Sequence, residues 1–381
     1  MNIPYGRQDI DAADIAAVTA VLQSDWLTQG PAVSAFEAAL ASRCGAAGAV
    51  AVNSATSALH LACLAVGLGP GDFGWTAPNT FVASANCIRY CGAEVDFVDI
   101  DPVTLNLSVP ALAAKLQAAR AAGRLPKVLI PVHFAGRACD MAAIGALARE
   151  YGVRIIEDAS HAVGATAQGQ PVGACLHSDL TVFSFHPVKI LTTGEGGAVL
   201  GQDRMLLDTV AALRSHGITR EPARLTRPDE GAWYYEQHAL GFNYRMTDLQ
   251  AALGVSQLKR LDGFLAQRRA LAQRYPALLA DLPVRCPPPD DTASWHLYVV
   301  HLNDPSRRRT VFDYLRAAGI GVQVHYIPVH TQPDYLRLGF KRGDYPAAEA
   351  HYSSALTLPL HARLNDAEQD FVVANLRKAL A

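Results

Sequence analysis

A lysine and an aspartate stand close behind two apolar segments of the chain. Asp158 ends the apolar run 153–158, and Lys189 comes shortly after the run 180–185. Lys189 has few charged neighbours in the sequence, so loss of solvent can lower its pKa and make its amine a nucleophile toward a carbonyl group. An aspartate near such a lysine can hold a proton on the nitrogen of an aromatic ring. The pair therefore indicates carbonyl–amine chemistry on a bound ring.

Hydroxyl groups follow a third apolar run. Residues 48–52 lead into Asn53-Ser54-Ala55-Thr56-Ser57, and we expect a helix over 58–66. The start of a helix offers free backbone N–H groups, which together with hydroxyls suit a phosphate. A reactive lysine, an aspartate and a phosphate site are together what pyridoxal phosphate requires.

Each of these features also has an ordinary explanation. A single lysine is commonly solvated, Asp158 can cap a turn, and the hydroxyls at 54–57 can cap a helix. The glycines at 194, 196 and 197 can shape a turn, and they match neither a Walker nor a Rossmann fingerprint. The cofactor hypothesis depends on all these features lying in loops at one edge of one sheet.

The elements that must position them alternate from about residue 46 to 245. Strands are expected at 48–52, 94–99, 127–132, 153–158, 180–185 and 197–200, with helices such as 58–66 and 141–151 between them. Apolar strands separated by helices predict an α/β fold with a mainly parallel sheet covered on both faces. Ligands of such sheets bind at the carboxyl ends of the strands, which is where Asp158 and Lys189 stand.

The pattern changes toward the C-terminus. Residues 217–231 predict a mobile loop, 247–250 resemble a capping box that opens a long helix, and the three prolines within 286–291 mark a linker. A strand at 295–301, a helix at 308–318, a strand at 321–326 and a helix at 366–380 predict a smaller α+β domain. We expect a large domain of residues 16–249 and a small domain of residues 250–381 joined by residues 1–15.

The composition limits the class of protein. Half of the 381 residues are hydrophobic and 18% are charged, which indicates a folded chain with a sizeable core. The formal charge of −2 provides no overall field for nucleic acid or an anionic membrane. With no signal-peptide pattern and no apolar stretch suited to a bilayer, we expect a cytoplasmic protein that binds neither.

A metal site is not expected. The seven scattered cysteines are typical of reduced thiols, and Cys87 with Cys91 lacks a second pair of ligands. Four histidines lack a metal-binding spacing and are expected to be core or loop residues: His133, His216, His296 and His330.

Longer motifs resemble one family of enzymes. They occur in order along nearly the whole chain, at residues 26–30, 53–59, 131–136, 157–161, 184–189 with 193–197, and 241–248. On these motifs the chain is identified as a member of the DegT-type nucleotide-sugar aminotransferases, which are fold-type I pyridoxal-phosphate enzymes. The resemblance implies a large domain with a mainly parallel sheet flanked by helices and a smaller C-terminal α+β domain.

The resemblance also implies roles around the cofactor. Lys189 would bind pyridoxal phosphate covalently and later move the proton at the reacting carbon, and Asp158 would keep the pyridine nitrogen protonated. Phe81 would stack on the ring unless it is an ordinary core aromatic, and His161 would lie near the ring hydroxyl, where many relatives have glutamine. Asn243 would reach the cofactor phosphate of the other subunit, so the active unit would be a homodimer with shared sites. The remaining phosphate contacts would be Ala55, Thr56, Ser57 and Ser184.

The C-terminal segments 323–330 and 358–361 resemble a narrower branch, the aminotransferases of the pseudaminic acid pathway. That resemblance implies amino transfer from L-glutamate to the C4 keto group of a UDP-linked 4-keto-6-deoxy-N-acetyl hexose. Arg245, His325 and Tyr326 are the candidate contacts of the sugar nucleotide, unless they are solvated or packed in the core.

Other functions stay open at this point. The acceptor could be a dTDP- or GDP-linked sugar with a 4-keto or 3-keto group. The chain could also be a pyridoxal-phosphate lyase or sugar dehydratase, or a non-enzymatic sensor on the same fold. Related dehydratases carry histidine at the position of Lys189, so the lysine disfavours that reading. The intact set of Lys189, Asp158 and phosphate-site residues disfavours a sensor.

Overall fold

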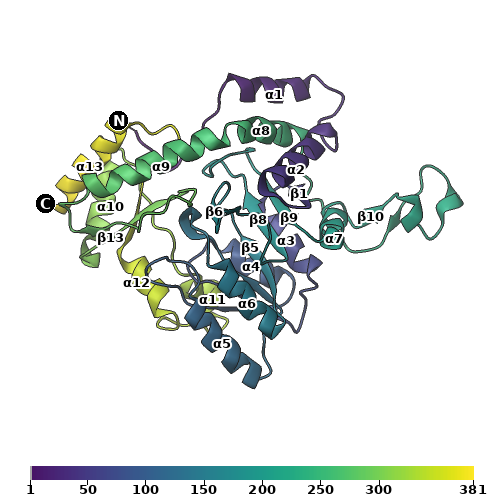
Figure 1. Ribbon diagram of the computed structural model, residues 1–381, viewed down its shortest axis with the longest axis horizontal. Coiled ribbons are helices and arrows are strands. Elements are labelled where there is room, and N and C mark those ends of the chain that lie inside the picture. Colours follow the sequence, from purple (N-terminus) through teal and green to yellow (C-terminus); the bar gives the residue numbers. More distant parts are fainter. Residues whose placement is uncertain (1) are drawn as a thin grey trace.

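The structure is a computed structural model that describes residues 2–381, and a seven-stranded sheet lies at its centre (Figure 1). In order across the sheet, the strands are β1 (Gly48–Val52), β9 (Gly197–Gly201), β8 (Leu180–Ser184), β5 (Arg154–Asp158), β4 (Val128–Ile130), β2 (Phe73–Thr76) and β3 (Glu94–Phe97). Strand β9 is antiparallel to both of its neighbours, and all other pairs are parallel. The carboxyl ends of the remaining strands therefore share one edge, and the predicted mainly parallel α/β sheet is confirmed.

Helices cover both faces of this sheet. On one face pack α3 (Ala55–Ala65), α4 (Ala83–Tyr90) and α7 (Arg204–Arg214); on the other pack α2 (Pro31–Cys44), α5 (Val109–Ala121) and α6 (Met141–Tyr151). Successive strand residues alternate between these two cores: Ile156 joins the α3 side, whereas Ile155 joins the α6 side. The alternation arises because successive side chains of a strand point to opposite faces of the sheet. Since both faces are covered here, the strand residues are almost entirely apolar.

A smaller α+β unit follows. Its sheet consists of β12 (Val284–Arg285), β13 (Tyr298–Leu302) and β14 (Ala355–Leu358), all antiparallel. Its helices are α9 (Leu261–Leu278), α10 (Arg308–Ala317), α11 (Pro333–Leu336), α12 (Pro346–Ser354) and α13 (Asp366–Leu380). The amino end of the chain joins this unit, because Ile3 is buried in its core and bridges Ile320. The division of the chain at residue 249 stays a prediction.

Two helices stand where one was expected after residue 247. Thr247 forms the predicted capping box with Gln250, but α8 (Asp248–Lys259) ends at Arg260, and α9 begins at the next residue. α1 (Ala12–Leu22) and α2 both pack on α8. Although α9 has 18 residues, no helix within residues 2–381 is long and apolar enough to cross a membrane.

The predicted loop at 217–231 belongs to an arm, residues 217–241, that extends from the body of the molecule (Figure 1). The arm contains a short antiparallel pair, β10 (Ile218–Thr219) with β11 (Glu236–Gln237). The turns η2 (Pro222–Arg224) and η3 (Pro228–Glu230) lie between these strands. The other short elements are the hairpin β6 (Thr166–Ala167) with β7 (Gln170–Pro171) and the turns η1 (Phe134–Gly136), η4 (Pro305–Arg307) and η5 (Val329–Thr331).

The strand predicted at 321–326 is wrong. Gln323 makes a single bridge to Thr357 of β14, and the chain then leaves the sheet. The cause is a competing contact, because the backbone N–H of Tyr326 donates to Asn79 Oδ1 of the large domain (3.3 Å). The apolar side chains of this segment pack in different cores, Val322 in that of the small unit and Tyr326 against residues that include Phe134 of the large domain.

Candidate active site

The features singled out in the sequence meet at the carboxyl edge of the large sheet. Asp158 is the last residue of β5, and Ser184 is the last residue of β8. Gly197, the first residue of β9, pairs with both Ser184 and Val52, so the ends of β1 and β8 lie on either side of it, and β5 is the next strand after β8. The segment 53–57, which follows β1, therefore begins beside the ends of β8 and β5.

Asp158 is buried and held by hydroxyl and amide donors. Ser84 Oγ of α4 donates to Oδ2 (2.6 Å), and the Ser160 N–H donates to Oδ1 (3.1 Å). Thr80 Oγ1 is 2.7 Å from Ser84 Oγ and extends the network. A carboxylate has about four acceptor positions, so Asp158 can still accept a hydrogen bond from a protonated ring nitrogen. No motif in the sequence marks Ser84, whose contact with Asp158 spans 74 residues.

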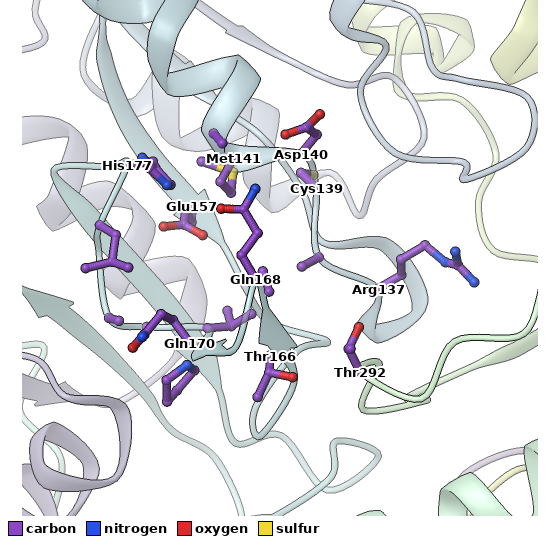
Figure 2. Close-up of a pocket in the computed structure, with 18 of the residues that line it drawn as sticks. Arg137, Cys139, Asp140, Met141, Glu157, Thr166, Gln168, Gln170, His177 and Thr292 are labelled. Atoms are coloured by element: carbon purple, nitrogen blue, oxygen red, sulfur yellow. The ribbon is translucent and has the colours of Figure 1, made fainter.

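Glu157 faces the opposite side of the sheet from Asp158. It accepts from His133 Nε2 (2.7 Å) and Thr181 Oγ1 (3.2 Å) and is also bonded to Ser178. His133 Nδ1 accepts the Cys139 N–H (3.0 Å), so the ring hydrogen lies on Nε2 and is shared with Glu157. Glu157 lines a cavity of about 540 Å³ beside α6 and the β6–β7 hairpin (Figure 2). Alternation along β5 therefore leaves only one of the two adjacent carboxylates at the candidate site.

Lys189 lies in the turn after β8, where its N–H donates to the His186 carbonyl (2.8 Å). Burial lowers the pKa of its amine to about 8, against the opposing effect of the negative charge on Asp158. At pH 7 about one amine in ten is then unprotonated, compared with roughly one in 3,000 for an ordinary lysine. The amine of Lys189 can therefore act as a base, and a useful fraction of it is in the unprotonated, nucleophilic form that attacks a carbonyl group.

The start of α3 forms a site suited to a phosphate. Ser54 caps the helix by accepting the Ser57 N–H (3.1 Å), and Ser57 Oγ donates to Asn53 Oδ1 (2.6 Å). The N–H groups of Ala55 and Thr56 have no partner within the helix and remain available to an anion. A Cβ at Gly197 would lie 2.6 Å from the Ala55 nitrogen, so only glycine allows α3 to begin this close to the sheet.

His161 and Tyr326 bring the two domains together at this edge. His161 Nδ1 accepts the Ala135 N–H (3.3 Å), so Nε2 carries the ring hydrogen and donates to Tyr326 Oη (3.1 Å). Burial, with the positive charge of Lys189, holds the pKa of His161 well below its usual value, so the ring is neutral. The Tyr326 hydroxyl hydrogen is then free to donate to another group.

His325 lies behind Tyr326 in the small domain. Its Nδ1 is 2.8 Å from Thr357 Oγ1, and its carbonyl accepts from His351 Nε2 (2.8 Å). Burial lowers the pKa of His325 to about 3, so it carries no charge at neutral pH. The structure therefore places His325 where it supports Tyr326, and a direct substrate contact by His325 stays a prediction.

The remaining predicted residues border the same edge. The Phe81 ring is 58% exposed and lies 6.4 Å from the Tyr326 ring, so its face is open to a ligand rather than packed in the core. Arg245 bridges Val52 at the end of β1, next to the start of α3. Asn243, two residues earlier, bridges Ser215 and is exposed.

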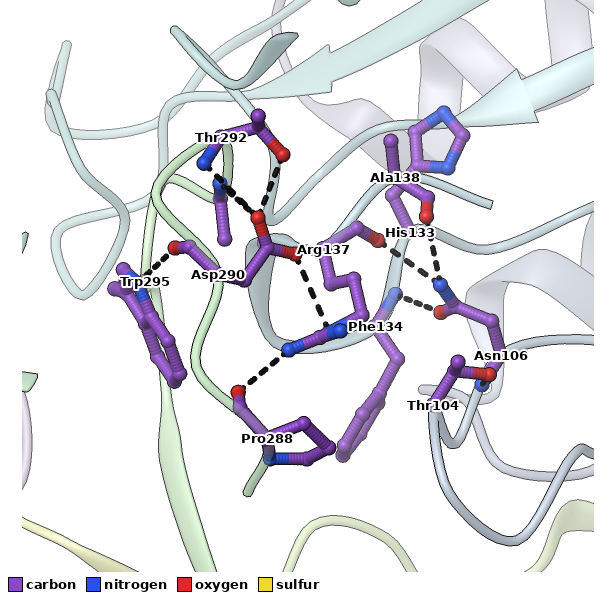
Figure 3. Close-up of polar contacts among 12 residues, drawn as sticks. Thr104, Asn106, His133, Phe134, Arg137, Ala138, Pro288, Asp290, Thr292 and Trp295 are labelled. Carbon is purple, nitrogen blue, oxygen red and sulfur yellow. Dashed lines mark hydrogen bonds and ion pairs between the residues drawn. The ribbon is translucent and has the colours of Figure 1, made fainter. Parts of the chain in front are cut away.

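A polar network fixes the linker of the small domain against the large one (Figure 3). Arg137 pairs with Asp290 (3.4 Å) and donates to the Pro288 carbonyl (2.7 Å). Beyond the linker, Ser294 Oγ donates to the His161 carbonyl (2.8 Å), and the His296 N–H donates to the Ala135 carbonyl (2.9 Å). These contacts bring the ring of His296 to 4.4 Å from that of His161.

Comparisons with known proteins agree with this arrangement. Residues 8–377 match the model of the DegT/DnrJ/EryC1/StrS aminotransferase family. The chain is 40% identical to the Bacillus subtilis (strain 168) spore coat polysaccharide biosynthesis protein SpsC, over 98% of this chain and 96% of that protein.

Solved structures are similar over the whole chain. Helicobacter pylori PseC, an aminotransferase involved in the biosynthesis of pseudoaminic acid, has a TM-score of 0.91 and 30% identity, covering 100% of this chain and 99% of PseC. The PLP form of the putative sugar aminotransferase Spr1654 from Streptococcus pneumoniae has a TM-score of 0.89 and 30% identity, covering 100% of both chains.

Proposed function

The chain belongs to the DegT/DnrJ/EryC1/StrS aminotransferases, which are pyridoxal-phosphate-dependent sugar transaminases, and we propose that its acceptor is a UDP-linked 4-keto-6-deoxy-2-acetamido hexose. In this proposal L-glutamate donates the amino group, and C4 of the sugar receives it. The similarity to PseC, whose substrate pathway is that of pseudoaminic acid, supports this choice of sugar.

The observation that carries the proposal is the meeting of Lys189, Asp158 and the start of α3 at one sheet edge. Asp158 would accept a hydrogen bond from the protonated ring nitrogen, with Ser84 holding the carboxylate in place. Ala55, Thr56, Ser57 and Ser184 would bind the phosphate. When bound, pyridoxal phosphate supplies a conjugated ring that takes up the electron pair left when a proton leaves the carbon next to nitrogen.

Lys189 would both hold the cofactor and handle protons. Its pKa of about 8 lets the amine accept a proton at the reacting carbon and return it at neutral pH. Phe81 would cover the ring face, and the His161–Tyr326 pair would lie beside the ring hydroxyl. The free hydroxyl hydrogen of Tyr326 supports a hydrogen bond to the sugar, and Arg245 supplies a positive charge for the diphosphate.

The identity of the sugar is tested by running the two half-reactions separately. Enzyme first aminated with L-glutamate should react fastest with the UDP-linked 4-keto-6-deoxy-2-acetamido hexose, followed by the return of the visible absorption of the cofactor. Sugars that differ in one small group should react about 10- to 200-fold more slowly, because one apolar contact contributes only ~1–3 kcal/mol. Aminated enzyme without sugar is the control.

Two results would contradict the proposed identity of the acceptor sugar but not the transaminase activity. If dTDP- or GDP-linked keto sugars react and all UDP-linked ones fail, the proposed acceptor is wrong, whereas the transaminase activity stands. A product aminated at C3, identified by NMR, would equally reject the C4 position.

We further propose that two subunits share each site through Asn243. Three large apolar side chains of the arm, which is continuous with the segment holding Asn243, are exposed: Trp233, Tyr235 and Leu240. Their exposure supports contact with a second copy of the chain.

Mixing two inactive variants tests the shared site. A heterodimer of Lys189→Ala and Asn243→Ala subunits would contain one intact site, so random exchange should restore about a quarter of the wild-type sites in a two-fold dimer. Each variant alone is the control, and mass spectrometry confirms that heterodimers form. Heterodimers that stay inactive would show that Lys189 and Asn243 of different subunits do not act together.

A further inference from the structure

His296 is a buried imidazole of the site that none of the roles above uses. It is 4% exposed, and its ring lies beside that of His161. Both of its backbone groups are held, because its N–H donates to the Ala135 carbonyl (2.9 Å) and its carbonyl accepts from Arg268 Nη1 (3.3 Å). The position of the ring is therefore set by the junction between the two domains.

The two nitrogens of this ring differ in what surrounds them. Nδ1 is sealed from solvent and has no hydrogen-bond partner within residues 2–381. A hydrogen on Nδ1 would be buried and unpaired, so the ring hydrogen belongs on Nε2. Nε2 is not sealed in this way, and no residue in the described range bonds to it. His161, in contrast, has both nitrogens engaged by protein groups.

The charges around His296 favour an anion at this position. Arg268 is 1% exposed, and its Nη1 bonds only to backbone carbonyls, those of Trp295 (3.2 Å), His296 (3.3 Å) and Leu360 (2.9 Å). Burial holds the pKa of His296 well below its usual value, and the positive charges of Lys189 and Arg268 act in the same direction. Burial keeps the ring neutral and so preserves Nε2–H as a donor, whereas the positive charges of Lys189 and Arg268 favour a negative group beside it.

We propose that His296 Nε2–H donates a hydrogen bond to the α-carboxylate of the amino donor. The α-carboxylate is attached to the carbon that bears the reacting amino group, so it must lie close to Lys189. The charge of Lys189 acts on His296, and the ring of His296 lies 4.4 Å from that of His161 at the same site. The diphosphate of the sugar substrate is attached at the far side of the hexose from C4 and cannot occupy the same place. This assignment rests on the proposed use of an amino-acid donor and makes His296 a determinant of donor binding.

Separate half-reactions of the holoenzyme test this role. His296→Phe removes both nitrogens and keeps a ring of similar size. We expect its KM for L-glutamate to rise about 10- to 100-fold, the range for a lost hydrogen bond to a charged group. The affinity for α-methyl-L-glutamate, which binds but has no α-hydrogen to lose, should fall by a similar factor in calorimetry. The reaction of the aminated enzyme with sugar should stay near the wild-type rate.

Two further variants separate this role from a structural one. His296→Gln retains an N–H donor and should recover part of the lost donor affinity. His361 is a buried histidine, and neither of its ring nitrogens has a hydrogen-bond partner among residues 2–381. Lys189 is not among the charges that bear on it. His361→Phe is therefore the matched control and should leave both half-reactions unchanged.

The outcomes are distinguishable. An equal loss in the donor and sugar half-reactions of His296→Phe, or no loss in either, would overturn the assignment. If the wild-type enzyme reacts with glutamate but with no UDP-linked sugar, the proposed acceptor is wrong. The role of His296 is then still tested by the glutamate half-reaction. If alanine or glutamine replaces glutamate as the donor, the same variants apply, since the α-carboxylate is common to all of them.

Discussion

Lys189→Ala should lose turnover by several orders of magnitude while keeping its fold. In the proposed mechanism this amine attacks the carbonyl carbon and carries the proton, so its removal should abolish both steps. Cofactor should still bind through Asp158 and the start of α3. The measurement is the steady-state rate with saturating glutamate and sugar, together with borohydride reduction, which should fix the cofactor to the peptide containing Lys189 in the wild type only.

The pH dependence of cofactor loading follows from the pKa of Lys189, which lies at about 8. The neutral amine is the reactive form, so the rate at which apoenzyme takes up pyridoxal phosphate should rise from pH 7 and level off above pH 8. An ordinary lysine would still be gaining rate well above pH 9. Lys259→Ala, at an exposed lysine of α8, is the control and should behave as wild type. Near-normal turnover in Lys189→Ala would reject the assigned role.

Asp158→Asn should lower turnover about 10²- to 10³-fold, the range for removing one preorganised electrostatic contact in an active site. Asparagine keeps the shape and can keep the contact with Ser84, but it lacks the negative charge that, in the proposed mechanism, would hold a proton on the ring nitrogen. The absorption spectrum of bound cofactor should shift along with the rate. Turnover and spectrum that both match wild type would reassign Asp158 to a structural turn.

Glu157→Gln is a matched control for this experiment, because the residue is adjacent on β5 and faces the other way. It should weaken the buried contact with His133 and lower the thermal midpoint of unfolding, since the pair loses its charge. The spectrum of bound cofactor should not change. Comparing Asp158→Asn with Glu157→Gln would then separate an effect on the reaction from an effect on the stability of the fold.

Much of the fold followed from local patterns in the sequence. The strands 48–52 and 197–201 and the helix 366–380 appear within one residue of their predicted positions, because apolar periodicity and capping residues act over a few neighbours. The motifs that resemble the aminotransferase family also predicted the fold class and the cofactor, and the family match and the similar PLP-form structure confirm both. The assigned site residues stay predictions, of which Lys189, Asp158 and Asn243 are tested by the variants above.

Predictions from local sequence patterns failed where the structure depends on a contact between residues far apart in the chain. Strand β2 was not predicted, because Gly74 interrupts its apolar run; a Cβ there would lie 2.8 Å from Ile88 of α4. The segment 321–326 alternates like a strand, yet the large domain competes for its backbone at Tyr326. Ser84 and His296 carry no motif, and their contacts with Asp158 and His161 depend on the packing of α4 and of the domain linker.

The sequence by itself determined the chemical identities at the site and the order of the elements that hold them. Lys189, Asp158 and the hydroxyls of 53–57 stand at the ends of apolar runs, or just after them, and these runs predict strands of a covered sheet. The tertiary structure alone decided which groups meet. The register of β9 brings α3 beside the ends of β8 and β5, and alternation along β5 directs Asp158 inward and Glu157 away. The register and the side-chain directions depend on pairings between residues far apart in the chain. A local sequence pattern cannot indicate how strongly such distant residues interact.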